Sequence, residues 1–139
     1  MPANQKPIFP LTPKAPATLP TLLTTANTAK DGTGTVVQVS ETAGANGAFC
    51  AAITALPIGT NTASVLRIFL NNGGANTTST NNILWKEVTL TASTLSEVAA
   101  QTPVVIPINE AIPAGFRLYA TIGTTVAAGW RVIALTGDY

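Results

Sequence analysis

Short runs of strand-forming residues, separated by turns rich in glycine and asparagine, fill the chain from Thr35 to its last residues. Short, fairly regular intervals between such runs are typical of an antiparallel sandwich or barrel. Apolar and polar residues alternate within the run from Phe116 to Ile122, which predicts a strand with one buried face. The seven runs are 35–40, 48–56, 64–71, 83–90, 104–108, 116–122 and 130–136. We therefore expect an all-β domain built as a two-sheet antiparallel sandwich.

The last run differs from the others because both of its faces carry apolar side chains. Val132 and Ala134 lie on one face, and Ile133 and Leu135 lie on the other beside Arg131. A strand that is apolar on both sides is typical of one that is covered on both sides.

The first twenty residues stand apart because they contain six of the ten prolines. Each proline removes an amide donor and pushes the preceding residue toward extended geometry, so we expect a polyproline-like arm without regular structure. The arm is either a disordered tail or a segment that lies along a neighbouring subunit. In the second case its apolar anchors are Ile8, Phe9, Leu11, Leu19, Leu22 and Leu23. We expect residues 1–30 to form this arm and residues 31–139 to form the sandwich domain.

Charged residues are scarce, with seven Lys and Arg, six Asp and Glu, and no His. A net charge of +1 gives little long-range attraction for phosphate, so we expect no nucleic acid partner. Without His the chain lacks the commonest general base and metal ligand. Its single cysteine, Cys50, lies in an apolar run that predicts a buried, unreactive thiol. We therefore expect neither an enzyme nor a cofactor or metal site.

Two features allow more than one interpretation. The segment 71–82 is either a contact surface or a mobile connection. Its candidate contact residues are Asn71, Asn72, Asn76, Asn81 and Asn82. The two tryptophans, Trp85 and Trp130, either stack on sugars or pack within the sandwich.

The sequence also carries expectations about location. No stretch approaches the roughly 18 apolar residues of a membrane-spanning helix, so we expect no membrane partner. The first residues lack the charged start and apolar run of a secretory signal, which predicts synthesis and folding in the cytoplasm.

Two segments carry a resemblance to a known family. The run Ile112-Pro113-Ala114-Gly115-Phe116-Arg117-Leu118-Tyr119 precedes a late strand, and the chain ends Leu135-Thr136-Gly137-Asp138-Tyr139. Together with a neutral, His-free β-domain behind a proline-rich start, these resemble the decoration or cement proteins of tailed-phage heads.

The resemblance implies a jelly-roll-like sandwich on the outer surface of the virion capsid. Its implied partners are the major capsid protein and a second copy of the chain, with a homodimer favoured and a trimer as the alternative. The implied function is to bridge neighbouring capsid subunits and stabilise the head against internal DNA pressure. No catalytic residue transfers from that family. The alternative is a receptor- or glycan-binding module of a phage tail or fibre.

Overall fold

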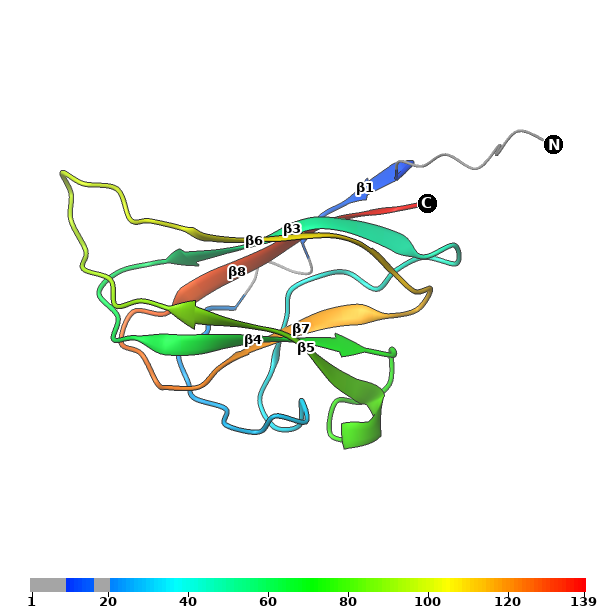
Figure 1. The fold of residues 1–139 in the computed structure, drawn as a ribbon, viewed down its shortest axis with the longest axis horizontal. Helices are drawn as coiled ribbons and strands as arrows, with labels where there is room; N and C mark the ends of the chain where they lie inside the picture. The colour runs from blue at the N-terminus through cyan, green and yellow to red at the C-terminus, as the bar shows by residue number, and fades with distance from the viewer. Residues whose placement is uncertain (1–9, 17–20) are drawn as a thin grey trace.

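A computed structural model describes residues 10–16 and 21–139 of the chain. The described residues form an antiparallel β-sandwich of eight strands, and its only helix is a single 3-10 turn (Figure 1). The elements are β1 (Thr12–Lys14), β2 (Val37–Gln38), β3 (Ala48–Pro57), β4 (Ser64–Asn71), η1 (Ser79–Asn81), β5 (Asn82–Leu90), β6 (Val104–Ile112), β7 (Arg117–Ile122) and β8 (Trp130–Asp138). The predicted all-β, two-sheet antiparallel architecture is confirmed.

The strand order is that of a jelly roll. One sheet has the order β1-β8-β3-β6 and the other has the order β2-β7-β4-β5. Each strand of the first half of the chain pairs with the strand at the matching place from the other end. The pairs are β1 with β8, β2 with β7, β3 with β6, and β4 with β5. This pattern arises when a long antiparallel ribbon wraps so that alternate pairs fall in alternate sheets, the two-Greek-key arrangement of a jelly roll.

The proline-rich segment contains a strand, which corrects the expectation that it has no regular structure. In β1, Thr12 pairs with Asp138 and Lys14 pairs with Thr136, at the edge of the first sheet. Proline is tolerated at a sheet edge, because its missing amide hydrogen can lie on the unpaired side. The ammonium of Lys14 also lies 2.9 Å from the Asp138 carboxylate. Segment 10–16 is therefore fastened to the last strand.

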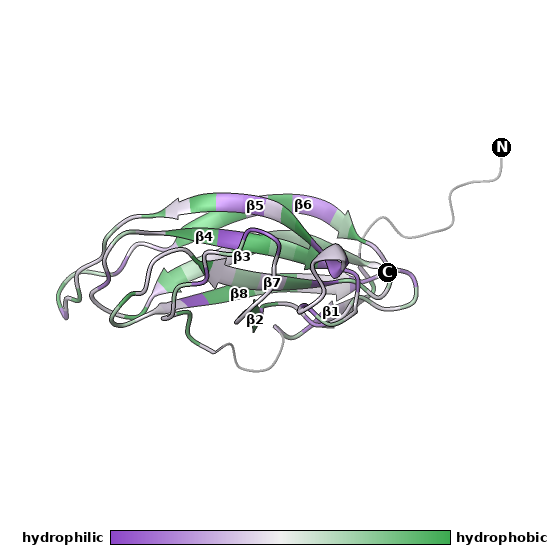
Figure 2. Ribbon diagram, turned by 90° about the horizontal axis from the view of Figure 1, so that it is seen from below, coloured by the Kyte–Doolittle hydropathy of each residue, from purple (hydrophilic) through white to green (hydrophobic). Residues whose placement is uncertain are grey.

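The hydrophobic core lies between the two sheets. It is built from alternate side chains of the long strands, such as Ile53 of β3, Leu66 of β4, Leu118 of β7 and Val132 of β8, all essentially inaccessible to solvent. Burial of each such side chain contributes about 1.5–3 kcal/mol to folding. Figure 2 shows that hydrophobic residues run along strands of both sheets. This core accounts for one face of each sheet.

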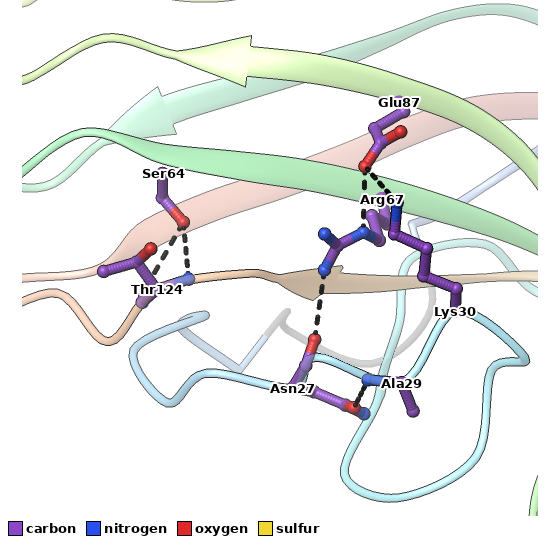
Figure 3. A network of polar contacts seen from close by, with 7 residues as sticks. All are labelled: Asn27, Ala29, Lys30, Ser64, Arg67, Glu87 and Thr124. Atoms are coloured by element: carbon purple, nitrogen blue, oxygen red, sulfur yellow. Dashed lines mark hydrogen bonds and ion pairs between the residues drawn. The ribbon is translucent and has the colours of Figure 1, made fainter.

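The outer face of the second sheet is covered by the chain itself. Arg67 and Phe69 point outward from β4 yet are buried, and Phe69 lies directly opposite the buried Tyr119 of β7. Arg67 donates through Nε to Glu87 at 3.0 Å and through a terminal nitrogen to the carbonyl of Asn27 at 3.3 Å (Figure 3). The segment 24–36 is thereby held across β4 and β7, where the blue and cyan trace lies in Figure 1.

Candidate interaction surface

The outer face of the first sheet has no comparable cover among the described residues. We call it the exposed face: the outward side chains of β3, β6 and β8. Register places Thr54 between Val105 and Ile133, and Ala52 between Pro107 and Leu135. Leu135 is 61% exposed and Val105 is 58% exposed. The remaining members are Phe49, Leu56, Ala111 and Arg131. A row of apolar side chains this open to water is typical of an interaction site.

The exposed face is almost without charge. Its only described charged residue is Arg131, which lies opposite Leu56 and is exposed. The acids of the same sheet point elsewhere. Glu110 contacts Lys86 of β5 at 3.2 Å, and Asp138 accepts from the amide of Gly44 and pairs with Lys14. Across the described residues, Arg131 has no acidic partner.

A hollow of about 670 Å³ adjoins the end of the exposed face that lies away from Arg131. Its wall includes Leu11, Tyr139 and Ala111, the last of which also belongs to the exposed face. The turns 45–47 and 112–114 complete the lining. Gly47 in this wall has a φ of +83°, and a Cβ there would lie 2.7 Å from the carbonyl oxygen of Ile112. Only glycine therefore fits that position without strain.

The edges of both sheets are interrupted, which disfavours the addition of a strand from another chain. On β6, Pro107 lacks an amide hydrogen and Asn109 has a φ of +52° beside a register shift. On β5, the register shifts at Trp85. The other two edge strands, β1 and β2, are only three and two residues long. Prolines, bulges and short edge strands are the usual means by which sheets avoid edge-to-edge pairing.

The predicted arm anchors fall in different places. Ile8, Phe9 and Leu19 lie outside the described residues. Leu11 is exposed at the rim of the hollow, and Leu22 is half-buried. Leu23 is buried in the chain's own core, where its amide and carbonyl pair with those of Trp130 at 2.9 and 3.0 Å. Leu23 is therefore not a partner-facing anchor, and segment 21–30 packs on the sandwich instead of extending away from it.

The predicted asparagine contacts bond mainly to one another and to nearby backbone. Asn71 donates to the Asn82 side chain at 2.8 Å, and Asn72 donates to that of Asn81 at 3.1 Å. Asn76 donates to the carbonyls of Gly32 and Gly34. The loop is therefore fastened to the 31–34 turn, and these amides stabilise it.

The two tryptophans are poorly placed to stack on a sugar. Trp130 is 1% exposed and belongs to the core. Trp85 is half-buried against the same core, with the ammonium of Lys86 5.1 Å from its ring centre. Core packing, one of the two interpretations of the sequence, describes both residues.

Chemical groups for catalysis are sparse in the part of the chain that the structure describes. Those residues contain no group of three or more His, Cys, Asp and Glu side chains that could hold a metal ion. Cys50 is buried, as predicted, and desolvation, with a smaller effect of Glu110, raises its pKa to about 11. A thiol in this state is a poor nucleophile. No helix in the described ranges is long and apolar enough to cross a membrane.

Sequence reasoning did not select the residues of the exposed face as contacts, although one signal was present. The apolar second side of the last run contains Leu135, which the structure leaves open to water, and Ile133, which is half-buried. The prolines and leucines of the arm gave a stronger pattern, because they cluster in sequence. The exposed face is assembled from three strands that are distant in sequence.

No family model, no curated protein and no solved structure matches this chain.

Proposed function

We propose that this chain is a structural virion protein, a capsid decoration or cement protein on the outer surface of a phage head. In this proposal it binds neighbouring major capsid subunits and opposes the outward pressure of the packaged DNA. It is made in the host cytoplasm, pairs with a second copy of itself, and has no catalytic role.

The observation that carries the proposal is the contrast between the two outer faces of the sandwich. The chain covers one of them with its own segment 24–36, whereas the exposed face leaves Leu135 and Val105 open. Permanent assemblies bury apolar, charge-poor surfaces of this kind. A cement protein needs such a surface, because it must hold every shell subunit that it touches in a lasting contact.

The exposed face is large enough to form part of a stable protein interface. Three strands of nine or ten residues cover about 30 by 15 Å, a projected area on the order of 450 Å². A stable interface buries about 800 Å² on each partner. The exposed face therefore supplies about half of one, and the hollow beside it extends the surface further.

The test is co-sedimentation of the purified protein with heads of the virus that encodes it, prepared without this protein. The Leu135→Glu variant places a charge within the exposed face, so we expect its affinity to fall at least about tenfold. The matched control is Ile83→Glu, since Ile83 is 59% exposed but lies on β5 of the other sheet. We expect the control to bind and to protect heads from thermal rupture as the unmodified protein does.

Two results would count against the proposal. If the unmodified protein neither binds heads nor raises the temperature at which they rupture, the cement function is wrong. If it binds host-cell glycans on an array instead, the tail or fibre alternative replaces it.

A further inference from the structure

We infer that the partner of the exposed face is a protein surface with little charge, recognised at two points: a carboxylate that pairs with Arg131 and a bulky apolar side chain that enters the hollow. This inference deepens the proposed function, on which it rests, by stating the chemistry of the shell surface. The inference concerns the exposed face of the full-length chain and no other surface.

The first point follows from the charges of the described residues. Four of their cations, Lys14, Lys30, Arg67 and Lys86, lie within 4.0 Å of a carboxylate. A fifth, Arg117, donates to the Asn71 side chain and to the carbonyls of Gly73 and Gly74. Among the described cations, Arg131 alone has neither a carboxylate nor another hydrogen-bond acceptor as a partner.

A guanidinium beside Leu56, within an apolar face, loses water when that face is covered. A buried charge of this kind is costly unless an opposite charge meets it. The covering surface must therefore supply an acid, and a carboxylate matches the planar donors of arginine in two parallel hydrogen bonds.

The second point follows from the hollow. Its volume of about 670 Å³ is within the range of pockets that hold a small ligand or several side-chain groups. Apolar side chains from Leu11, Ala111 and Tyr139 contribute to its wall. A large apolar side chain that fills such a pocket is the usual energetic centre of a protein interface. Tyr139 follows the last residue of β8 and is eight positions after Arg131, which places the two points about 27 Å apart in extended chain.

The same observations disfavour other occupants of this face. A second copy would bring Arg131 against a face that has no described acid, so the charge would stay unpaired. Anionic lipid surfaces and nucleic acids are held by several clustered cations, whereas this face has one. The partner that these groups fit is a different protein.

The experiment measures the affinity of full-length variants for heads that lack this protein, at 50 and 300 mM salt. Arg131→Gln removes the charge, and we expect about tenfold weaker binding at low salt with a smaller loss on raising the salt, whereas Arg131→Lys should restore part of both. Ala111→Phe fills the hollow from an exposed position of its wall. We expect it to weaken binding about tenfold at both salt concentrations.

Other outcomes separate the two-point inference from the proposed function. If Leu135→Glu abolishes binding but Arg131→Gln and Ala111→Phe bind as the unmodified protein does, the two-point inference is wrong while the proposed function stands. Binding to vesicles containing anionic lipid that is lost in Arg131→Gln would overturn the protein partner. Loss of a dimer in Leu135→Glu, measured by sedimentation, would replace it with a second copy.

Discussion

A single buried thiol shows how far residue-level reasoning reaches in this chain. The apolar run around Cys50 predicted burial, and the structure places Cys50 inside the core with its pKa raised to about 11. The local run was sufficient because both neighbours along the strand are apolar. For Leu23 the local sequence was misleading: a leucine among prolines has the pattern of an arm anchor, and only its pairing with Trp130, more than a hundred residues away, puts it in the core.

The Cys50 thiol should resist alkylation in the native protein. At pH 8, a thiol that ionises near pH 11 instead of the ordinary 9.0 holds about 100-fold less thiolate, which is the reactive form. We expect iodoacetamide to modify the folded protein at least about 100-fold more slowly than the chain unfolded in guanidinium. Equal rates in the two states would contradict the burial of this group.

The same pKa predicts a pH dependence of stability. The folded-state value lies above the unfolded one, so the native chain keeps a proton that the unfolded chain loses between about pH 9 and 11. The contribution of Cys50 to the free energy of unfolding is therefore present below pH 9 and is lost as the pH rises toward 11. We expect the unmodified protein to lose more stability between pH 8 and 10.5 than Cys50→Ala, measured by urea unfolding. Parallel losses in the two proteins would show that Cys50 does not contribute.

At the scale of the elements, the asparagine-rich loop is a structural device. Asn82 accepts from Asn71 at 2.8 Å and donates to the carbonyls of Asp31 and Asn76 at 3.0 and 2.9 Å. The sequence showed the concentration of asparagines but could not show their partners, because side-chain amides serve equally well as surface contacts and as internal ties.

Replacing Asn82 with alanine should loosen this loop. The change leaves three backbone and side-chain groups without a partner, at a cost of about 1–3 kcal/mol in the free energy of unfolding. Asn72→Ala is the control, since Asn72 is exposed and bonds only within its own loop. We expect Asn72→Ala to lose less free energy of unfolding than Asn82→Ala, measured by urea unfolding. We also expect faster proteolysis within residues 72–81 for the Asn82 variant alone. Equal stability of the two variants would argue against the tie to the 31–34 turn.

The strand β1 fastens part of the proline-rich segment to β8. Removing residues 1–9 leaves β1 in place, so we expect the thermal midpoint to stay unchanged. Removing residues 1–16 deletes the pairing with β8 and the contact between Lys14 and Asp138, and we expect the midpoint to fall by about 5–10 °C.

Lys14→Ala in the full chain isolates the ion pair and should lower the midpoint by a smaller amount. Calorimetry of the four proteins measures these effects. A melting curve unchanged by removal of residues 1–16 would mean that β1 does not stabilise the sandwich.

At the scale of the whole molecule, periodicity predicted the strands and their class but not their order. The run 104–108 extends to Ile112 in the structure, and the run 35–40 contributes only Val37–Gln38 to a ladder. The order β1-β8-β3-β6 depends on pairings between the ends of the chain. Alternation along a strand indicates which side is buried, not which strand lies beside it. The resemblance implied a jelly roll, and the strand order agrees with that fold.

The candidate surface was even less accessible to sequence reasoning than the topology. Leu135, Val105 and Leu56 come from three strands, and their exposure depends on what the rest of the chain covers. The second sheet has equally apolar outward positions at Phe69 and Tyr119, yet segments of the same chain bury them. Only the folded arrangement distinguishes a face that the protein covers for itself from one that it leaves exposed.

The loop 91–103 projects from the end of the sandwich opposite the C-terminus (Figure 1). Its Val98 is 98% exposed. Ser93 pairs with Asn61 at the base of the loop, and this contact anchors the projecting part to the sandwich. A peptide inserted at Val98 would be exposed to solvent, far from Leu11 and Tyr139. On a particle coated with this protein, that site would offer a dense array for multivalent display.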